Sequence, residues 1–322
     1  MSLKNRLGEG ASFKLSCKAI TSLKVFAIVN SRSGPTGESC ASQLETLFAK
    51  QDVQIKIVEL DGVRSPKTLA EDAVRQKYDV IVTAGGDGTI NAVASGMVGN
   101  SAIKLGIIPR GTLNHFAHAL EIPVDIEKAV ETIVAGHTKL VDVGQVNDCI
   151  FINNSSIGLY PAIVRMRENL QHSGLGKWPA ALWASIRIFS RFRRLSLGLV
   201  TASGVTIRQV TSMLFIGNNA YETSFPALGQ RPTLEGGKIW IMMPKSATRW
   251  GLIASFIKMI SHRDSASDSV TMEANELTVH CKRHFIKVAI DGEVIQLRSP
   301  LRYSIRPKSL RVIVPAHKKL EA

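Results

Sequence analysis

The sequence predicts an α/β protein of two domains, in which an N-terminal parallel α/β domain precedes a mainly antiparallel β domain. Three observations lead to this fold. The chain has 322 residues, and a single hydrophobic core seldom grows much past about 250 residues. Over the first 140 residues, short apolar runs alternate with stretches of helical spacing. From residue 141 onward, the apolar runs are separated mainly by turns.

The N-terminal domain repeats a strand–turn–helix unit three times. The expected strands span residues 24–29, 79–84 and 104–108, and each is an almost continuous apolar run. Such strands are typical of a parallel sheet that helices cover on both faces. In the second unit Thr89 is placed to cap the helix. The buried stripe of that helix consists of Ile90, Val93, Ala94 and Met97.

The turns after these strands are rich in glycine. Because parallel strands end at the same edge of a sheet, we expect the turns holding Gly34, Gly86, Gly88 and Gly111 to meet there. Glycine lets backbone N–H groups approach phosphate oxygens, and the following helix N-termini add partial positive charge. A tight turn alone explains any one of these glycines, whereas three such turns at one edge favour a phosphate site. Neither the Walker pattern nor the dinucleotide pattern GxGxxG occurs in them.

The C-terminal domain is expected to begin near residues 136–140. This boundary gives two domains, of residues 1–140 and 141–322. An alternative is that the last segment of the chain returns to the first domain. Seven strand regions are expected beyond it, at residues 149–158, 195–203, 205–219, 238–244, 269–281, 285–297 and 309–315.

Two helices are expected to interrupt these strands, at residues 174–195 and 247–262. In the first, an aliphatic and aromatic face lies beside a row formed by Arg187, Arg191 and Arg194. Such a helix suits the headgroup region of an anionic membrane. A helix that packs on the second domain with its arginines in solvent shows the same pattern, so both interpretations stand.

The charge balance favours an anionic partner. Lys and Arg outnumber Asp and Glu by 40 to 26, which suits a nucleotide, a nucleic acid or an anionic lipid surface. No nucleic-acid reader motif occurs, so no nucleic acid is expected. The four cysteines form no CxxC pair, which argues against a zinc ribbon and fits a reducing compartment. The start of the chain lacks the apolar region of a secretory signal.

Five short motifs, in order along the chain, resemble those of the diacylglycerol kinase catalytic-domain family of lipid kinases, in its bacterial branch. "GGDGTIN" (85–91) matches the family's signature loop. "VNSRSG" (29–34) resembles its first turn, with Ser31 in place of proline, and "PRGTLNHFA" (109–117) resembles its third loop. "FIGNN" (215–219) and "IDGE" (290–293) match landmarks of the second domain. The resemblance extends over nearly the whole chain, whereas GGDG alone is shared with phosphofructokinases and NAD kinases.

The resemblance implies a nucleotide-binding α/β domain, similar to those of NAD kinase and phosphofructokinase, and a β-sandwich domain. It also implies transfer of phosphate from ATP to a lipid hydroxyl, with Mg²⁺, by a cytoplasmic protein at an anionic membrane surface. Asp87 and Glu293 are the implied catalytic carboxylates, and their division between base and metal ligand stays open. The implied nucleotide-binding residues are Asn30, Ser33, Gly34, Gly85, Gly86, Gly88, Thr89, Gly111, Thr112 and Asn114.

Some positions depart from the family pattern. His115 stands where many relatives have aspartate, and Gly236 and Trp240 stand at two positions that are acidic in many relatives. A structural Mg²⁺ near residues 235–241 is therefore in doubt. The missing acidic side chains also keep a second hypothesis open. In this hypothesis the protein is a degenerate kinase that binds nucleotide or lipid without catalysis. An NAD kinase is disfavoured because no Asn-Glu pair follows the loop.

Overall fold

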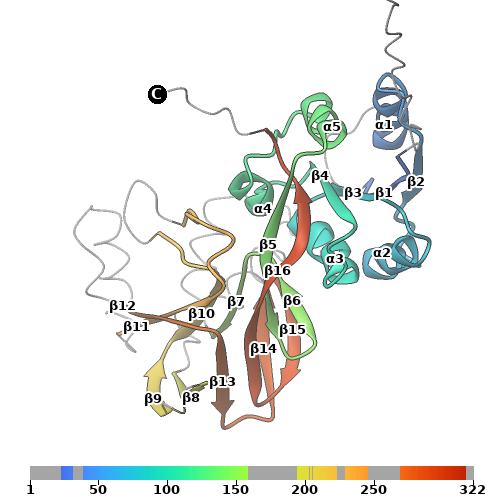
Figure 1. Ribbon diagram of the computed structural model, residues 1–322. Coiled ribbons are helices and arrows are strands. Elements are labelled where there is room, and N and C mark those ends of the chain that lie inside the picture. The colour runs from blue at the N-terminus through green and yellow to red at the C-terminus, as the bar shows by residue number, and fades with distance from the viewer. Residues whose placement is uncertain are drawn as a thin grey trace, which may run out of the picture.

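The computed structural model of the protein describes residues 23–31, 39–158, 194–202, 204, 206–222, 229–245 and 269–316 (Figure 1). Two sheets organise these residues, one of ten strands and one of six. The N-terminal part of the larger sheet is parallel, and the smaller sheet is antiparallel. The predicted fold class is therefore confirmed.

The N-terminal layer is a parallel sheet in the order β2-β1-β3-β4. Its strands are β1 (Val25–Val29), β2 (Ile55–Glu59), β3 (Val80–Gly85) and β4 (Lys104–Pro109). Its helices are α1 (Cys40–Ala49), α2 (Pro66–Arg75), α3 (Asp87–Met97), α4 (His115–Ala119) and α5 (Ile126–Ala135). All of β1 and β3 is buried, as the continuous apolar runs predict.

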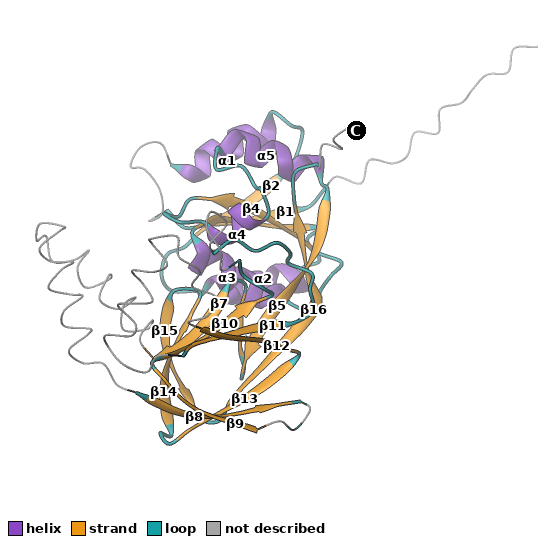
Figure 2. Cartoon of the chain, turned by 90° about the vertical axis from the view of Figure 1, so that its left-hand side faces the viewer, coloured by secondary structure: helices purple, strands orange, loops and turns teal. Residues whose placement is uncertain are grey.

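The helices cover the parallel sheet on both faces (Figure 2). Along β1, Phe26 and Ile28 join the core that includes residues of α2, α3 and α4. Val25, Ala27 and Val29 point to the other face and join the core with α1 and α5. Successive side chains of a strand alternate between faces, so each face receives its own apolar set.

Two details of this layer were not predicted correctly. The edge strand β2 was not among the three strands expected, because its residues are only partly buried or exposed and Lys56 and Glu59 interrupt its apolar run. Helix α3 begins at Asp87, with Gly86 as its N-cap. Thr89 therefore does not cap this helix but lies in its first turn, where its Oγ1 atom accepts a hydrogen bond from Asn30 Nδ2.

The C-terminal part consists of strands that surround a second core. The strands are β5 (Thr138–Val146), β6 (Cys149–Phe151), β7 (Asn154–Gly158), β8 (Leu195–Thr201), β9 (Thr206–Thr211), β10 (Met213–Asn218), β11 (Ile239–Pro244), β12 (Ser269–Ala274), β13 (Glu276–Cys281), β14 (Phe285–Ile290), β15 (Glu293–Arg298) and β16 (Leu301–Ile313). The smaller sheet has the order β12-β11-β10-β7-β14-β15. The core lies between this sheet and strands β8, β13 and β16 of the larger one.

Three regions expected as single strands each divide between the sheets. The stretch 149–158 breaks at residues 152–153 into β6 and β7, the stretch 205–219 at Ser212 into β9 and β10, and the stretch 269–281 at Asn275 into β12 and β13. In each case one part belongs to the larger sheet and the other part to the smaller one. A chain that turns a corner between stacked sheets keeps its apolar alternation, so the pattern does not reveal the break.

Strand β16 connects the two parts of the molecule (Figure 1). It is 13 residues long, and it pairs antiparallel with β5 and β13. Near its end it runs parallel to β4, where Val312 pairs with Leu105. Its register against β5 shifts between Arg306 and Leu310.

No helix in the described part of the chain is long and apolar enough to span a membrane. The helix expected at residues 247–262 lies outside the described residues. So does the helix expected at 174–195, apart from its last two positions, where Arg194 is exposed and Leu195 begins β8.

Candidate active site

The glycine turns after β3 and β4 are in direct backbone contact. A Cβ atom added to Gly111 would lie 2.6 Å from the Cα atom of Gly86, and one added to Gly86 would lie 3.1 Å from the Cα atom of Gly111. A side chain at either position would therefore push the two loops apart. The turn after β1 joins them, because Asn30 Nδ2 donates to Thr89 Oγ1 at 3.1 Å.

Gly85 also accommodates the start of α3. A Cβ atom at this position would lie 2.8 Å from the Cβ atom of Thr89. Ser33 and Gly34, the other two residues expected from the first turn, lie outside the described residues.

Asn114 holds the third loop closed. Its Oδ1 atom accepts from the Gly111 N–H at 2.8 Å, and its Nδ2 atom donates to the Gly111 carbonyl at 2.9 Å. Its backbone is left-handed, with φ of 49°, and the residue is buried. Asn114 thus shapes the loop, whereas Thr112, in the same loop, is exposed.

The Asp87 carboxylate lies at the N-terminus of α4. Its Oδ2 atom accepts from the His115 N–H at 3.0 Å, and its Oδ1 atom accepts from the Phe116 N–H at 3.1 Å. The first N–H groups of a helix lack partners within the helix, and a negative charge is favourable there. Asp87 therefore links the glycine loop to the third loop and is held in a fixed position between them.

Glu293 approaches the same loop from the smaller sheet. A Cβ atom added to Gly88 would lie 2.7 Å from Glu293 Oε1. Glu293 follows the two-residue turn of the β14–β15 hairpin, in which Asp291 and Gly292 have φ of 46° and 92°. The stretch is thus an Asp-Gly hairpin, and the first residue of its second strand is a carboxylate that reaches the glycine loop.

Asp291 has a structural role that was not expected from the sequence. Its carboxylate accepts the backbone N–H groups of Ile152, Asn153 and Asn154, at 2.8 to 2.9 Å. Burial of this carboxylate raises its pKa to about 6, against the opposing effect of these N–H groups and of Arg231. Asp291 thereby fixes the β6–β7 turn beside the turn that carries Glu293.

The β6–β7 turn in its turn contacts Asp87. Asn153 Nδ2 donates to Asp87 Oδ1 at 3.4 Å. Arg231 donates from Nη2 to Asn153 Oδ1 and from Nη1 to the Ile152 carbonyl, each at 2.7 Å. Neither Asn153 nor Arg231 was predicted as a site residue, because neither belongs to a glycine motif.

The positions that depart from the family pattern have other roles. The His115 side chain is exposed, and the backbone N–H of this residue donates to Asp87. Trp240 packs against the rings of Phe215 and Tyr221. A Cβ atom at Gly236 would lie 2.8 Å from Asn219 Oδ1. Gly236 and Trp240 therefore contribute to packing, and neither position supplies an acidic side chain.

The remaining carboxylates near residues 235–241 are also engaged. Glu235 pairs with Lys139 at 3.1 Å, and Asp142 accepts the N–H groups of Gly237 and Lys308. Over the residues that the structure describes, no three metal-ligating side chains cluster. The residues of this stretch therefore do not fit a structural Mg²⁺.

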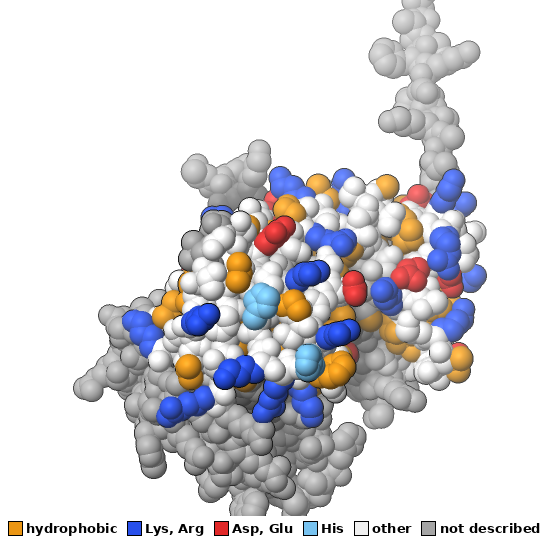
Figure 3. Space-filling view, turned by 90° about the horizontal axis from the view of Figure 1, so that it is seen from below, with side chains coloured by type: hydrophobic (Ala, Val, Ile, Leu, Met, Phe, Trp, Pro, Cys, Tyr) orange, Lys and Arg blue, Asp and Glu red, His pale blue; other side chains and the backbone are white. Residues whose placement is uncertain are grey.

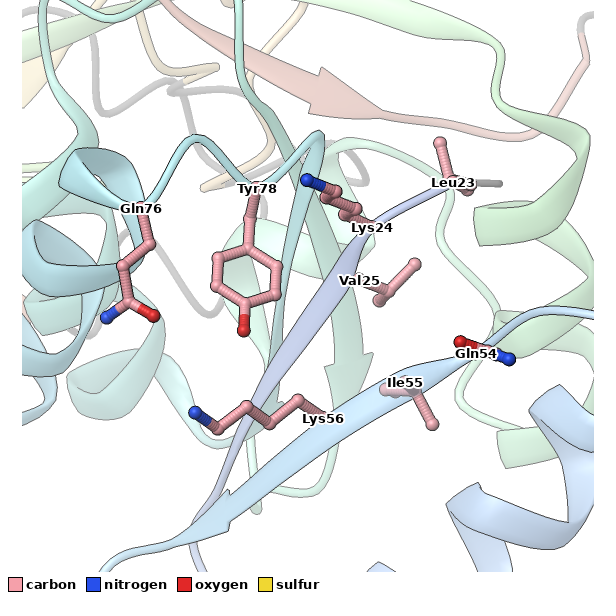
Figure 4. Close-up of a pocket in the computed structure, with 8 residues that line it drawn as sticks. All are labelled: Leu23, Lys24, Val25, Gln54, Ile55, Lys56, Gln76 and Tyr78. Carbon is pink, nitrogen blue, oxygen red and sulfur yellow. The ribbon is translucent and has the colours of Figure 1, made fainter. Parts of the chain in front are cut away.

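An open groove lies at the opposite ends of the parallel strands (Figure 4). Its lining includes Lys24 and Val25 at the start of β1, Ile55 and Lys56 at the start of β2, and Tyr78 before β3. Parallel sheets bind ligands beyond the carboxyl ends of their strands. The glycine loops, and not this groove, are therefore the candidate site.

Part of the chain is similar to a known family of catalytic domains. Residues 24–146 match the family model of the diacylglycerol kinase catalytic domain. This span of the chain is similar to that catalytic domain. The matched span contains the three glycine turns, with Asp87 and Asn114, and it ends within β5.

Relatives of this catalytic domain include diacylglycerol kinases of Staphylococcus aureus, which are 47% identical over 90 residues. That match covers 28% of this chain and 29% of the staphylococcal protein. An uncharacterized protein of Synechocystis is 29% identical over 281 residues, covering 84% of this chain and 63% of that protein. The chain thus matches less than two thirds of the length of either relative.

The fold is similar to that of a diacylglycerol kinase from Bacillus anthracis. The two structures superpose with a TM-score of 0.63 at 19% sequence identity, over 91% of this chain and 97% of the other. Because the overlap includes both sheets, the likeness extends to the two-domain architecture.

Proposed function

We propose that this protein is a lipid kinase that transfers the γ-phosphate of ATP to a hydroxyl of diacylglycerol or a related lipid. The observation that carries the proposal is the meeting of two carboxylates at one glycine loop. Asp87 comes from the loop itself, and Glu293 reaches Gly88 from the other sheet. The diacylglycerol kinase catalytic domain gives this arrangement its reaction class.

The glycine loops supply the nucleotide site in this proposal. Phosphoryl transfer depends mainly on positioning the phosphates and neutralising their charge. The contact between Gly86 and Gly111 leaves no side chain between the two loops, so backbone N–H groups remain the nearest donors to a phosphate. Asn30 and Thr89 hold the first turn against the second.

The two carboxylates have distinct surroundings. Asp87 is fixed by two backbone N–H groups, whereas Glu293 is exposed at the start of β15. A carboxylate within reach of the acceptor hydroxyl can accept its proton as phosphate is transferred. We assign this role to Asp87, because its hydrogen bonds hold it in one orientation.

Mg²⁺ is the metal that this chemistry uses. In kinases it is held by one or two carboxylates together with substrate phosphates and water. Asp87 and Glu293 provide two such carboxylates at the glycine loop, so the donor set fits. When bound, Mg²⁺ neutralises negative charge on the phosphates.

An anionic membrane is the partner that the proposal requires. At the far end of the smaller sheet, Phe285 is 60% exposed and pairs across the hairpin with Arg298. Lys282 and Arg283 precede it and are exposed. Figure 3 views the molecule from this end, and Lys and Arg side chains outnumber acidic ones on the face that it shows. An exposed aromatic ring beside basic side chains suits the headgroup region of an anionic bilayer.

The decisive experiment measures transfer of labelled γ-phosphate from ATP to a panel of lipids in mixed micelles with Mg²⁺. The wild type should label one lipid class, and Asp87→Asn should reduce the rate by about 10²- to 10⁴-fold. Asp52→Asn, at an exposed aspartate after α1, is the matched control and should retain activity.

A second outcome supports the degenerate-kinase hypothesis. In that case the wild type binds ATP, measured by calorimetry, but labels none of the lipids. Such a result would refute the proposed lipid kinase activity and leave the nucleotide site in place.

A further inference from the structure

We infer that Arg231 is a positioning residue that sets the orientation of Asp87 through Asn153 and Phe116. The inference rests on the proposed function, in which Asp87 accepts the hydroxyl proton. Arg231 lies in the segment between β10 and β11, far from every glycine motif in the sequence. Two separate contact paths lead from its guanidinium group to the Asp87 carboxylate.

The first path passes through the side-chain amide of Asn153. A guanidinium group only donates hydrogen bonds, so it can bind only the oxygen of this amide. Arg231 Nη2 donates to Asn153 Oδ1 at 2.7 Å, which leaves Nδ2 as the end that faces Asp87. Asn153 Nδ2 then donates to Asp87 Oδ1 at 3.4 Å. Arg231 therefore selects the amide orientation that presents a donor to the carboxylate.

The backbone of Asn153 is fixed as well. The Arg231 Nη1 atom donates to the Ile152 carbonyl, and the Tyr221 hydroxyl donates to the Asn153 carbonyl at 3.0 Å. Asp291 accepts the N–H groups on the other side of the same turn. The backbone of Asn153 is thus fixed on both sides. The orientation of its side-chain amide is then set by the hydrogen bond from Arg231.

The second path passes through Phe116. The Arg231 guanidinium carbon lies 5.9 Å from the centre of the Phe116 ring, and 5.7 Å from that of Tyr221. These distances fall within the range of cation–π contacts. The Phe116 backbone N–H donates to Asp87 Oδ1, the same oxygen that accepts from Asn153. Arg231 thus supports both donors to one oxygen of Asp87.

The geometry requires arginine rather than another cation. Its planar fork binds the Ile152 carbonyl and Asn153 Oδ1 at the same time, at 2.7 Å each, while its face lies near aromatic rings. Lysine is a single point of charge and cannot reproduce a forked, stacked contact. Arg231→Lys should therefore recover only part of the function lost in Arg231→Met.

The test is a double-mutant cycle on lipid phosphorylation. Arg231→Met should lower kcat by about 10- to 100-fold, as is typical when an outer-shell partner is lost. The KM for ATP should change by less than about twofold, because the glycine loops are intact. In an Asn153→Ala background, Arg231→Met should cause little further loss. Arg208→Met, at an exposed arginine of β9, is the matched control.

Two results would overturn the inference. One is a folded Arg231→Met variant with a wild-type kcat. The other is full additivity of the two substitutions, which would mean that Arg231 does not act through Asn153.

If the wild type phosphorylates no lipid, the proposed function fails and the positioning role is judged separately. Hydrogen exchange of the His115 and Phe116 amides, which bind Asp87, then provides the measurement. Arg231→Met, Arg231→Lys and Asn153→Ala should each accelerate this exchange, with Arg231→Lys the mildest. Exchange at the wild-type rate in all three variants would refute the positioning role.

Discussion

Gly88 and Glu293 meet across the two sheets, because a Cβ atom added to Gly88 would lie 2.7 Å from Glu293 Oε1. The missing side chain of Gly88 is the space that the Glu293 carboxylate uses. Together with the contact of Asn153 on Asp87, this contact brings the second sheet to the glycine loop, and it can be tested without disturbing the rest of the fold.

Gly88→Ala should reduce phosphoryl transfer while the protein remains as stable as the wild type, or more so. The added methyl group displaces the end of a flexible side chain, and alanine in a helix is favoured over glycine by about 1 kcal/mol. Kinase assays and urea unfolding of the same preparation check this. Gly198→Ala is the control, since its Cβ atom would make only an ordinary contact with His280, at 3.6 Å. An active Gly88→Ala variant would show that Glu293 is not needed at this position.

Asp291→Asn should remove a pH dependence of stability. Burial raises the pKa of Asp291 in the folded state to about 6, from its ordinary value of 3.8. Folding therefore favours the protonated form, and this residue's contribution falls as the pH rises from about 4 to 6, by about 3 kcal/mol in all. We expect the free energies of unfolding of the wild type and Asp291→Asn, measured in urea between pH 4 and 7, to differ by an amount that changes with pH. Asp52→Asn, the same substitution at an exposed aspartate after α1, is the control.

Asn114→Ala should destabilise the protein by about 2 to 3 kcal/mol, since it removes two hydrogen bonds and places alanine in a left-handed conformation. Asn114→Gly separates these causes. Glycine tolerates the φ of 49°, so only the hydrogen-bond contribution should be lost. Thermal unfolding of both variants provides the comparison, and equal stability of the two would mean that backbone strain contributes nothing.

Lys282→Glu combined with Arg283→Glu should weaken sedimentation with phosphatidylglycerol vesicles. Each basic residue near an anionic surface contributes about 1 kcal/mol, so affinity should fall at least about tenfold. The variant should keep its activity in detergent micelles, where no anionic bilayer is present. Lys50→Glu with Lys128→Glu makes the same charge change at exposed positions of the N-terminal part. If both double variants lose binding equally, net charge and not this end of the molecule determines vesicle binding.

The glycine loops could be predicted from the sequence because their convergence follows from a general property of parallel strands. Gly86 and Gly111 each follow an apolar run that predicts a strand, and the pairing of these two strands brings the glycines together. Glu293 was predicted by resemblance alone, since an Asp-Gly hairpin gives no sign of which loop lies opposite.

The network of Asn153, Arg231 and Asp291 could not be predicted, because its contacts join segments distant in the chain. Asn153 and Asp291 are separated by 138 positions, and Arg231 and Asn153 by 78. Nothing in the periodicity of β7, β14 or the segment before β11 marks these side chains. They become neighbours only after the smaller sheet has formed its order of strands.

The position of β16 has a consequence for whether residues 24–146 can fold on their own. The matched span of residues 24–146 includes β4 and β5 but not the strand that lies between them in the sheet. During synthesis, the edges of β4 and β5 that pair with β16 therefore remain unpaired until residues 301–313 have been made. Unpaired edges of this kind associate readily with other chains. An excised fragment of residues 24–146 should aggregate, and the glycine loops become part of a stable unit only when β16 closes the sheet.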